Sequence, residues 1–259
     1  NYEKISSLSK KIISKISIIY TQSKSHASRF EKLGAPVEKI ECVGSVKFDI
    51  DPSSKESSSN NSKPFILAAS THPGEDEIII DAYKNILEDN QEIGLVIAPR
   101  HPERAYAIKK LLDKTNLNVR ILQEIPKDIA NESIEIINGT GMLRELYSKA
   151  QFAFVGGSLF QSNGGHNIIE PAFERCPFVV GPHMHNFQDI LKLFVDEDAC
   201  LQIDKNLDVL SGFKDLLNNN GLRENMSSKA FEICLKNKGS TDKQCTGIIK
   251  MINKKEVIS

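Results

Sequence analysis

The 259-residue sequence has no tryptophan, only five cysteines and no long hydrophobic run. No apolar stretch approaches the roughly 18 residues that a membrane-spanning helix needs. The cysteines are odd in number and form no C-x-x-C pair, which favours reduced thiols in a cytosolic compartment over a disulfide framework or a zinc site. We interpret all five as structural: Cys42, Cys176, Cys200, Cys234 and Cys245.

The chain also lacks an excess of charge of either sign. Its 33 Lys and Arg residues and 34 Asp and Glu residues give a formal net charge of -1. No overall basic field therefore suggests a nucleic-acid partner. Hydrophobic residues make up 40% of the sequence, enough for a normal core, so we expect a globular protein of one large domain or of one domain and part of another.

The common phosphate-binding fingerprints are missing as well. The sequence contains no G-x-x-x-x-G-K-[ST] segment, and "GTGMLR" departs from G-x-G-x-x-G because Arg144 stands in place of the third glycine. These absences argue against a P-loop kinase or ATPase and against an NAD-binding enzyme.

What the chain does contain is an alternation of short apolar runs with amphipathic segments. After the polar, Ser-rich stretch 51–63, which we interpret as a linker, this alternation predicts a parallel sheet with helices on both faces. The strand-like runs are "PFILAAS", "GLVIAPR", "VRILQ", "IEIIN", "FAFVGG", "PFVVGP" and "CLQI". The spacing in "GEDEIIIDAYKNILEDN" predicts a helix with Glu75 and Asp76 in its first turn.

The segment before the linker follows the same pattern on a smaller scale. "ISIIYTQS" is typical of a strand, "SKSHASRFEKLG" of a helix that ends at Gly34, and "KIECVGSVKFD" of a second strand. We interpret this segment as the tail of a preceding α/β domain.

Doubly wound sheets bind ligands beyond the carboxyl ends of their strands. Four places fit: Lys47 after "CVGSV", "PRHPER" after "GLVIA", "NGTGM" after "IEII", and "GGHNIIEP" beyond "FAFVGG". The guanidinium of Arg100 suits a phosphate or carboxylate, although it could equally be a surface arginine paired with an acid. For His72 and His101 we favour ordinary loop positions.

"GGHNIIEP" is the most specific of the four. Gly164 and Gly165 allow close backbone approach, and a helix that starts near Asn167 would offer free N–H groups to a phosphate, with Arg100 closing the site from the neighbouring strand. Asn167 and Glu170 have the spacing of a capping box. The same carboxylate could accept both ribose hydroxyls of a nucleotide sugar, and spacing alone does not separate the two roles.

Several motifs together resemble a known family. "FAFVGGSLFQSNGGHNIIEPAFERCPFVVGPHMHNFQDI", with "STHPGEDE", "APRHPER" and "YTQSKSHASRFEKLGA...VGSVKFD", is similar to the 3-deoxy-D-manno-octulosonic acid (Kdo) transferases of lipopolysaccharide synthesis, over nearly the whole chain. The resemblance implies an α/β fold of the GT-B type, in which two Rossmann-like domains face each other across a cleft. The implied divisions are 1–50, the end of the N-terminal acceptor-side domain; 51–63, the linker; 64–235, the CMP-sugar domain; and 236–259, a C-terminal helix and tail.

The resemblance also implies an activity and a site. Members of the family transfer Kdo from CMP-Kdo to a lipid A precursor such as lipid IVA, with inversion and without a metal or other cofactor. Carried over position by position, the CMP-binding residues are Pro99, Arg100, Thr140, Gly141, Met142, Asn167, Ile168, Ile169 and Glu170. The family has Met-Gly-Glu where this chain has Thr140, Gly141 and Met142, so backbone contacts are expected there. Lys47 matches a lysine that stabilises the transition state, although without the resemblance it would be interpreted as an ordinary strand-end lysine.

The family's general base, a glutamate, precedes the part of the family that this chain matches, as do its acceptor site and its membrane-facing surface. Glu31, on a later helix, is not that base. We therefore expect attachment to the cytoplasmic side of the inner membrane through the preceding part, and a 259-residue chain that binds CMP but does not transfer Kdo. Two alternatives stay open: a UDP-sugar epimerase of similar architecture, and a non-catalytic nucleotide-sugar-binding remnant.

Overall fold

The computed structural model describes residues 6–51, 63–89, 92–113, 115–125, 129, 132–204 and 208–256. Most of the stretch 51–63, which the sequence suggests is a linker, lies outside the described residues. The chain divides into two compact units: Asn1–Asp51 with Cys234–Ser259, and Pro52–Ile233. In the described ranges, none of the helices combines the length and the apolar character that crossing a bilayer would need.

The smaller unit is built on a two-stranded parallel sheet. Its elements are α1 (Ser6–Ser14), β1 (Ile19–Thr21), α2 (Lys24–Lys32), η2 (Val37–Lys39), β2 (Ile40–Cys42), η3 (Val46–Phe48) and α10 (Ser240–Glu256). As expected, α2 ends just before Gly34, which has a φ of +94°.

The second strand of this unit is shorter than the sequence predicts. It ends at Cys42 because Gly44 adopts a φ of +93°, which no extended strand contains. The Ser45 hydroxyl then accepts a hydrogen bond from the backbone N–H of Lys47 at 3.4 Å. Lys47 therefore lies in the single turn of η3 rather than at a strand end.

The larger unit contains one seven-stranded sheet among the residues that the structure describes. Every neighbouring pair is parallel, and the order is β5-β6-β4-β3-β7-β8-β9. The strands are β3 (Phe65–Thr71), β4 (Gly94–Pro99), β5 (Asn118–Leu122), β6 (Ser133–Ile137), β7 (Phe152–Val155), β8 (Phe178–Val180) and β9 (Leu201–Gln202). This confirms the predicted parallel sheet. The chain builds outward from β3 in one direction and then returns to β7 on its other side, so the strand order reverses between β3 and β7.

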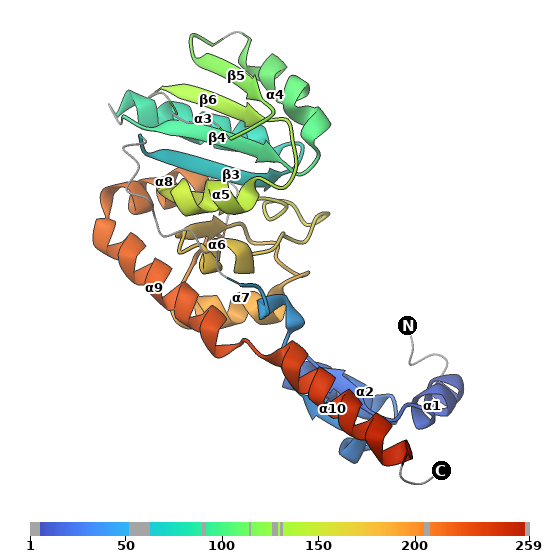
Figure 1. Ribbon diagram of the computed structural model, residues 1–259. Coiled ribbons are helices and arrows are strands. Elements are labelled where there is room, and N and C mark those ends of the chain that lie inside the picture. Colours follow the sequence, from blue (N-terminus) through green and yellow to red (C-terminus); the bar gives the residue numbers. More distant parts are fainter. Residues whose placement is uncertain are drawn as a thin grey trace. The chain divides into compact units, whose positions relative to one another are not determined.

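Helices cover both faces of this sheet (Figure 1). They are α3 (Glu75–Glu88), α4 (Ala105–Leu112), α5 (Leu143–Lys149), α6 (Ile169–Phe173), α7 (Gln188–Val195), α8 (Val209–Asn218) and α9 (Asn220–Lys236), with η4 (Pro102–Arg104) ahead of α4. Right-handed crossovers place α3 and α4 on one face. They place α5, α6 and α7, which follow the reversal, on the other.

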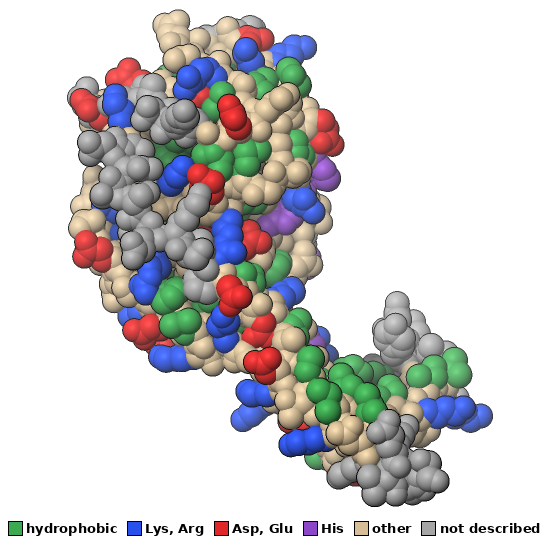
Figure 2. All heavy atoms as spheres, in the orientation of Figure 1, with side chains coloured by type: hydrophobic (Ala, Val, Ile, Leu, Met, Phe, Trp, Pro, Cys, Tyr) green, Lys and Arg blue, Asp and Glu red, His purple; other side chains and the backbone are tan. Residues whose placement is uncertain are grey.

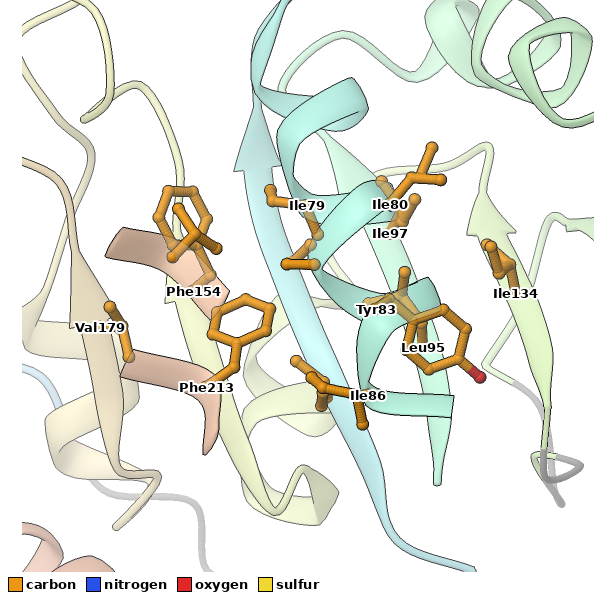
Figure 3. Packing of buried hydrophobic residues seen from close by; sticks show 14 of the residues in the cluster. Ile79, Ile80, Tyr83, Ile86, Leu95, Ile97, Ile134, Phe154, Val179 and Phe213 are labelled. Carbon is orange, nitrogen blue, oxygen red and sulfur yellow. The ribbon is translucent and has the colours of Figure 1, made fainter. Parts of the chain in front are cut away.

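A large hydrophobic cluster lies beneath α3 and α8 (Figure 3). Ile79, Tyr83 and Ile86 project from one side of α3, at the helical spacing, onto alternate residues of β3, β4 and β6. Phe213 of α8 meets Phe154 of β7, with ring centroids 6.4 Å apart. All seven residues of β3 are buried, so the reversal point next to β3 rests on a rigid core.

Candidate functional site

Three of the predicted segments meet at the carboxyl edge of the larger sheet. A cavity of about 120 Å³ opens there, and its walls include five residues expected to bind CMP. These residues are Pro99, Arg100, Thr140, Gly141 and Met142. They come from the ends of β4 and β6, which are paired neighbours in the sheet. The cavity therefore joins two motifs that lie forty residues apart in the sequence.

The turn at 139–142 shapes one wall of this cavity. Gly141 has a φ of +79°, and nothing lies within 4 Å of the position where a Cβ would be, so its backbone is open to a ligand. Met142 caps the start of α5 without a side-chain hydrogen bond. This arrangement fits the expected backbone contacts at Thr140 to Met142 and offers no carboxylate there.

Arg100 lies at the mouth of the cavity. Its backbone N–H donates to the Thr71 carbonyl at 3.0 Å, which fixes the residue beside the end of β3. Its side chain is exposed and, in the part of the chain that the structure describes, takes part in no ion pair or hydrogen bond. No acidic residue among those described pairs with Arg100, as the alternative of a surface ion pair would require. The guanidinium therefore remains available to an anion.

The segment Asn167–Glu170 departs in detail from the predicted capping box. The helix α6 begins at Ile169 and spans only five residues, so its dipole is small. The N-cap residue is Ile168, which makes no side-chain capping hydrogen bond, and Asn167 closes a turn just before the helix because its Oδ1 accepts from the N–H of Ile169 at 3.1 Å. Glu170, however, accepts from the Asn167 side-chain amide at 3.0 Å rather than from that residue's backbone N–H. The predicted free helix start at Asn167 is thus replaced by a side-chain-capped turn.

Glu170 keeps room for a further partner. A carboxylate has about four acceptor positions, and in the described residues the Asn167 amide is its one hydrogen-bond donor. Ile168 and Ile169 are completely buried, so neither residue presents surface to a ligand in this structure. Asn167 to Glu170 do not line the cavity. They lie at and before α6, which packs against α5, the helix that begins at the cavity wall.

Arg100 does not approach "GGHNIIEP" from a neighbouring strand. That expectation was wrong because β3 lies between β4 and β7. The residues that connect the two halves of the edge are instead histidines. The Nε2 atoms of His72, just after β3, and His166, beyond β7, are 2.8 Å apart, and their rings are parallel within 8°. The His101 ring stands edge-on to His72 at a centroid distance of 6.1 Å.

Histidine side chains accordingly appear together at one margin of the larger unit (Figure 2). Gly157 makes room for the pair. A Cβ at this position would lie 2.8 Å from the His166 ring, and its φ is +67°. No local motif indicates this pair, because its members lie 94 positions apart in the sequence. The available signal was positional, since each histidine follows a strand that flanks the reversal of strand order.

A buried glutamate holds the same loops in place. The Glu75 carboxylate accepts backbone N–H groups from His72, Gly157, Ser158 and Leu159 at 2.7–3.0 Å. Glu75 is completely buried at the start of α3. Because it already occupies these amides, the loop after β7 does not offer them to an external anion. Among the described residues, Arg100 keeps an exposed and unpaired guanidinium at this edge, and the histidines lie at the same edge.

Burial and neighbouring positive charge keep the histidines neutral. For His166, burial first, then His72, Arg100 and His101, lower the pKa to about 4. Burial also lowers the pKa of His72, with Glu75 opposing and His101, Arg104 and Arg100 assisting. Both imidazoles are therefore uncharged at neutral pH, and one Nε2–H donates to the other ring.

Arg104 is not available to a ligand in the way that Arg100 is. Its guanidinium contacts the completely buried Asp76 and donates to the Thr71 carbonyl at 2.9 Å. Burial raises the pKa of Asp76, and Arg104 opposes this rise. This ion pair anchors η4 to the start of α3 and so supports the loop that carries Arg100.

Two further predictions concern other parts of the chain. Lys47 lies in the smaller unit and is not part of the cavity. All five cysteines are free, as expected. Among the described residues, no group of three or more histidine, cysteine, aspartate or glutamate side chains is arranged to hold a metal ion.

Comparison with known proteins agrees with this architecture. A family model described as 3-deoxy-D-manno-octulosonic-acid transferase (kdotransferase) matches residues 1–50. The chain is 32% identical over 250 residues to 3-deoxy-D-manno-octulosonic acid transferase from Haemophilus influenzae, covering 92% of this chain and 58% of that protein. It is 30% identical over 220 residues to the enzyme of the same name from Rickettsia conorii, covering 82% and 47%.

A solved structure matches a large part of the chain. The C-terminal CMP-Kdo binding domain of WaaA from Acinetobacter baumannii is 30% identical, with a TM-score of 0.60, and the match covers 67% of this chain and 90% of that one. The chain belongs to the Kdo transferase family. Its fold is accordingly that of the GT-B glycosyltransferases. The chain spans only about half the length of the curated relatives that it matches.

Proposed function

We propose that this chain is the donor-binding part of a glycosyltransferase that moves Kdo from CMP-Kdo to a lipid A precursor such as lipid IVA. In this reaction the bond between the anomeric carbon of Kdo and a phosphate oxygen breaks, and the oxygen leaves with the electron pair as part of CMP. An acceptor hydroxyl oxygen forms the new bond on the opposite face, so the configuration inverts. A general base removes the hydroxyl proton, and no metal takes part.

The observation that carries this proposal is the cavity at the carboxyl edge. It places Pro99, Arg100 and the 140–142 turn together in the unit that is 30% identical to a CMP-Kdo binding domain. The available guanidinium of Arg100 suits the donor phosphate. The spare acceptor positions of Glu170 suit the two ribose hydroxyls. Lys47 would balance charge on the departing CMP in the transition state.

Calorimetry with nucleotides tests the donor. We expect the chain to bind CMP and to bind UMP at least about tenfold more weakly, which corresponds to a loss of about 1.4 kcal/mol in binding free energy. We expect the same affinities in the presence of magnesium and of a chelator. Preference for UDP would favour the epimerase alternative. A folded chain that does not bind CMP would overturn the proposal.

A transfer assay tests whether donor binding and Kdo transfer depend on different parts of the enzyme. The acceptor site and the general base are proposed to lie in parts of the relatives outside the match, at the cytoplasmic face of the inner membrane. The 259-residue chain should therefore bind CMP without transferring Kdo to lipid IVA. Transfer by this chain alone would show that the base lies within it. If a longer protein that contains these residues binds CMP but is also inactive, the non-catalytic alternative is favoured.

A further inference from the structure

The histidine pair lies where the fold places ligands. His72 and His166 meet at the reversal between β3 and β7, and the two adjoining loops are fixed by the four amides that Glu75 binds. In doubly wound sheets the crevice at such a reversal holds the phosphates of nucleotides. Both histidines are only partly buried, so each keeps some surface exposed.

We propose that His72 and His166, together with Arg100, bind the anionic centre of the sugar nucleotide, and that this binding takes up one proton into the imidazole pair. The inference rests on the proposed function and extends it to residues that no motif indicated. The ligand class is a sugar nucleotide with a phosphodiester and a sugar carboxylate. His72 and His166 are then binding residues whose charge is supplied by the ligand's arrival.

The proton count follows from the geometry. In the neutral pair one ring donates its Nε2–H to the other, which leaves one Nδ1 bare and the other Nδ1 protonated. One added proton fills the bare Nδ1, so that both Nδ1 atoms become donors and the pair carries one positive charge. No bond within the protein has to break. An anion that enters the crevice stabilises this charged form, and by linkage the charged form binds the anion more tightly.

The charges that face the pair set the direction of the effect. Arg100, His101 and Arg104 oppose protonation of His72, while Glu75 favours it, and Arg100 and His101 oppose protonation of His166. Arg104 is committed to Asp76. Without a ligand the positive neighbours prevail and the pair is neutral. A bound anion offsets Arg100 in particular, which removes part of the repulsion on both rings.

Calorimetry in buffers of different ionisation enthalpy counts the protons. The ligands are cytidine 5′-methyl phosphate, a phosphodiester whose charge is constant between pH 6 and 8; free Kdo, which carries only the carboxylate; and cytidine, which carries neither. With the phosphodiester we expect uptake approaching one proton and an affinity that rises by up to about tenfold for each pH unit of acidification within the linkage window. Uptake with Kdo instead would assign the carboxylate as the anion. No uptake with either ligand overturns the proposal.

Two variants separate the pair from the rest of the protein. His72→Gln/His166→Gln, which removes both imidazoles, cannot take up a proton at this site, so it should bind more weakly and without proton uptake. His26→Asn, on α2 of the smaller unit, is the matched control and should behave as the wild type. Uptake that persists in the double variant would overturn the proposal even if affinity falls.

Imidazole ¹⁵N spectra of the wild-type protein give an answer that does not depend on a variant folding. The pKa of His166 should rise when inorganic phosphate or the phosphodiester is added, and not with cytidine. If CMP fails to bind while inorganic phosphate still raises that pKa, the anion site stands and the nucleotide assignment falls. If CMP binds and the pKa does not move, the proposed function stands and the histidine site falls.

Discussion

At the scale of single residues, Arg100 has the most direct expected effect on donor binding. Its guanidinium has no partner in the described structure and lies at the cavity mouth. Arg100→Ala should weaken CMP binding by about 1.5–3 kcal/mol, the usual value of a hydrogen bond to a charged group. Calorimetry measures it, with Arg29→Ala on the smaller unit as the control. Equal affinities for the wild type and Arg100→Ala would remove Arg100 from the site.

Glu170 has two roles that one comparison can separate. Glu170→Gln keeps the side-chain size but loses the charge that strengthens hydrogen bonds from ribose hydroxyls. It should therefore weaken CMP more than 2′-deoxy-CMP. The contact with the Asn167 amide predicts a second, structural effect. If both nucleotides weaken equally and the melting temperature falls, Glu170 only stabilises the turn before α6.

His166 should make stability depend on pH. Its pKa is about 4 in the folded chain and near 6.5 when unfolded. As pH falls below 6.5, His166 is protonated in the unfolded state, whereas in the folded state it stays neutral until about pH 4. The free energy of unfolding therefore decreases as pH falls from about 6.5 to about 4. Urea unfolding in phosphate-free buffer between pH 7.5 and 5 should show a shallower decline for His166→Gln. Parallel pH profiles would contradict the burial of a neutral His166.

The sequence predicted Arg100 and missed the histidines for a physical reason. An arginine at the end of a buried strand suits an anion, although its type and position alone do not separate a ligand from an acidic neighbour. An imidazole in a loop has many uses. What gives His72 and His166 a function is their mutual contact, which depends on strand order, and strand order is a tertiary property that no local pattern encodes.

At the scale of elements, the strands of the larger sheet could be predicted from apolar runs in the sequence, because the sheet is buried on both faces. A short apolar run such as residues 65–71, bounded by turn residues, is consistent with a strand buried on both faces, and its short length favours a strand over a helix. Lengths were less predictable. The left-handed Gly44 shortens β2, and α6 begins at Ile169, two residues later than expected, after a turn closed by the Asn167 side chain. Both differences arise from single backbone torsions or side-chain hydrogen bonds.

The close approach of β3 and the loop after β7 depends on a glycine. A Cβ at Gly156 would lie 2.5 Å from the Ser70 carbonyl oxygen and 2.8 Å from the Thr71 Cα, both backbone atoms. Gly156→Ala should therefore lower the free energy of unfolding by about 1–3 kcal/mol, as overpacking does. Gly221→Ala, in α9, where a Cβ would lie at an ordinary contact distance of 3.6 Å from the Asn219 Oδ1, should be neutral or stabilising by up to about 1 kcal/mol. Denaturant unfolding compares them. Similar losses in both would deny any special role to the β3–β7 contact.

At the scale of the whole molecule, donor binding should stabilise one unit only. The cavity and the histidine pair belong entirely to Pro52–Ile233. CMP at about 100 times its dissociation constant stabilises the state that binds it by about 2.7 kcal/mol. Amides of β3, β4 and β7 should then exchange with solvent up to about 100-fold more slowly, and those of β1 and β2 at their original rate. Equal slowing in both units would place part of the donor site outside the larger one.

The carboxylate of Glu75 gives the crevice a mechanical property. Four backbone amides, one from the turn after β3 and three from the loop after β7, end on the same two oxygen atoms. Neither segment can open without breaking charge-assisted bonds to the other. The turn after β3 and the loop after β7 are thus coupled. Their motions should be correlated in time, so that they move as one rigid body rather than as two loops that fluctuate separately.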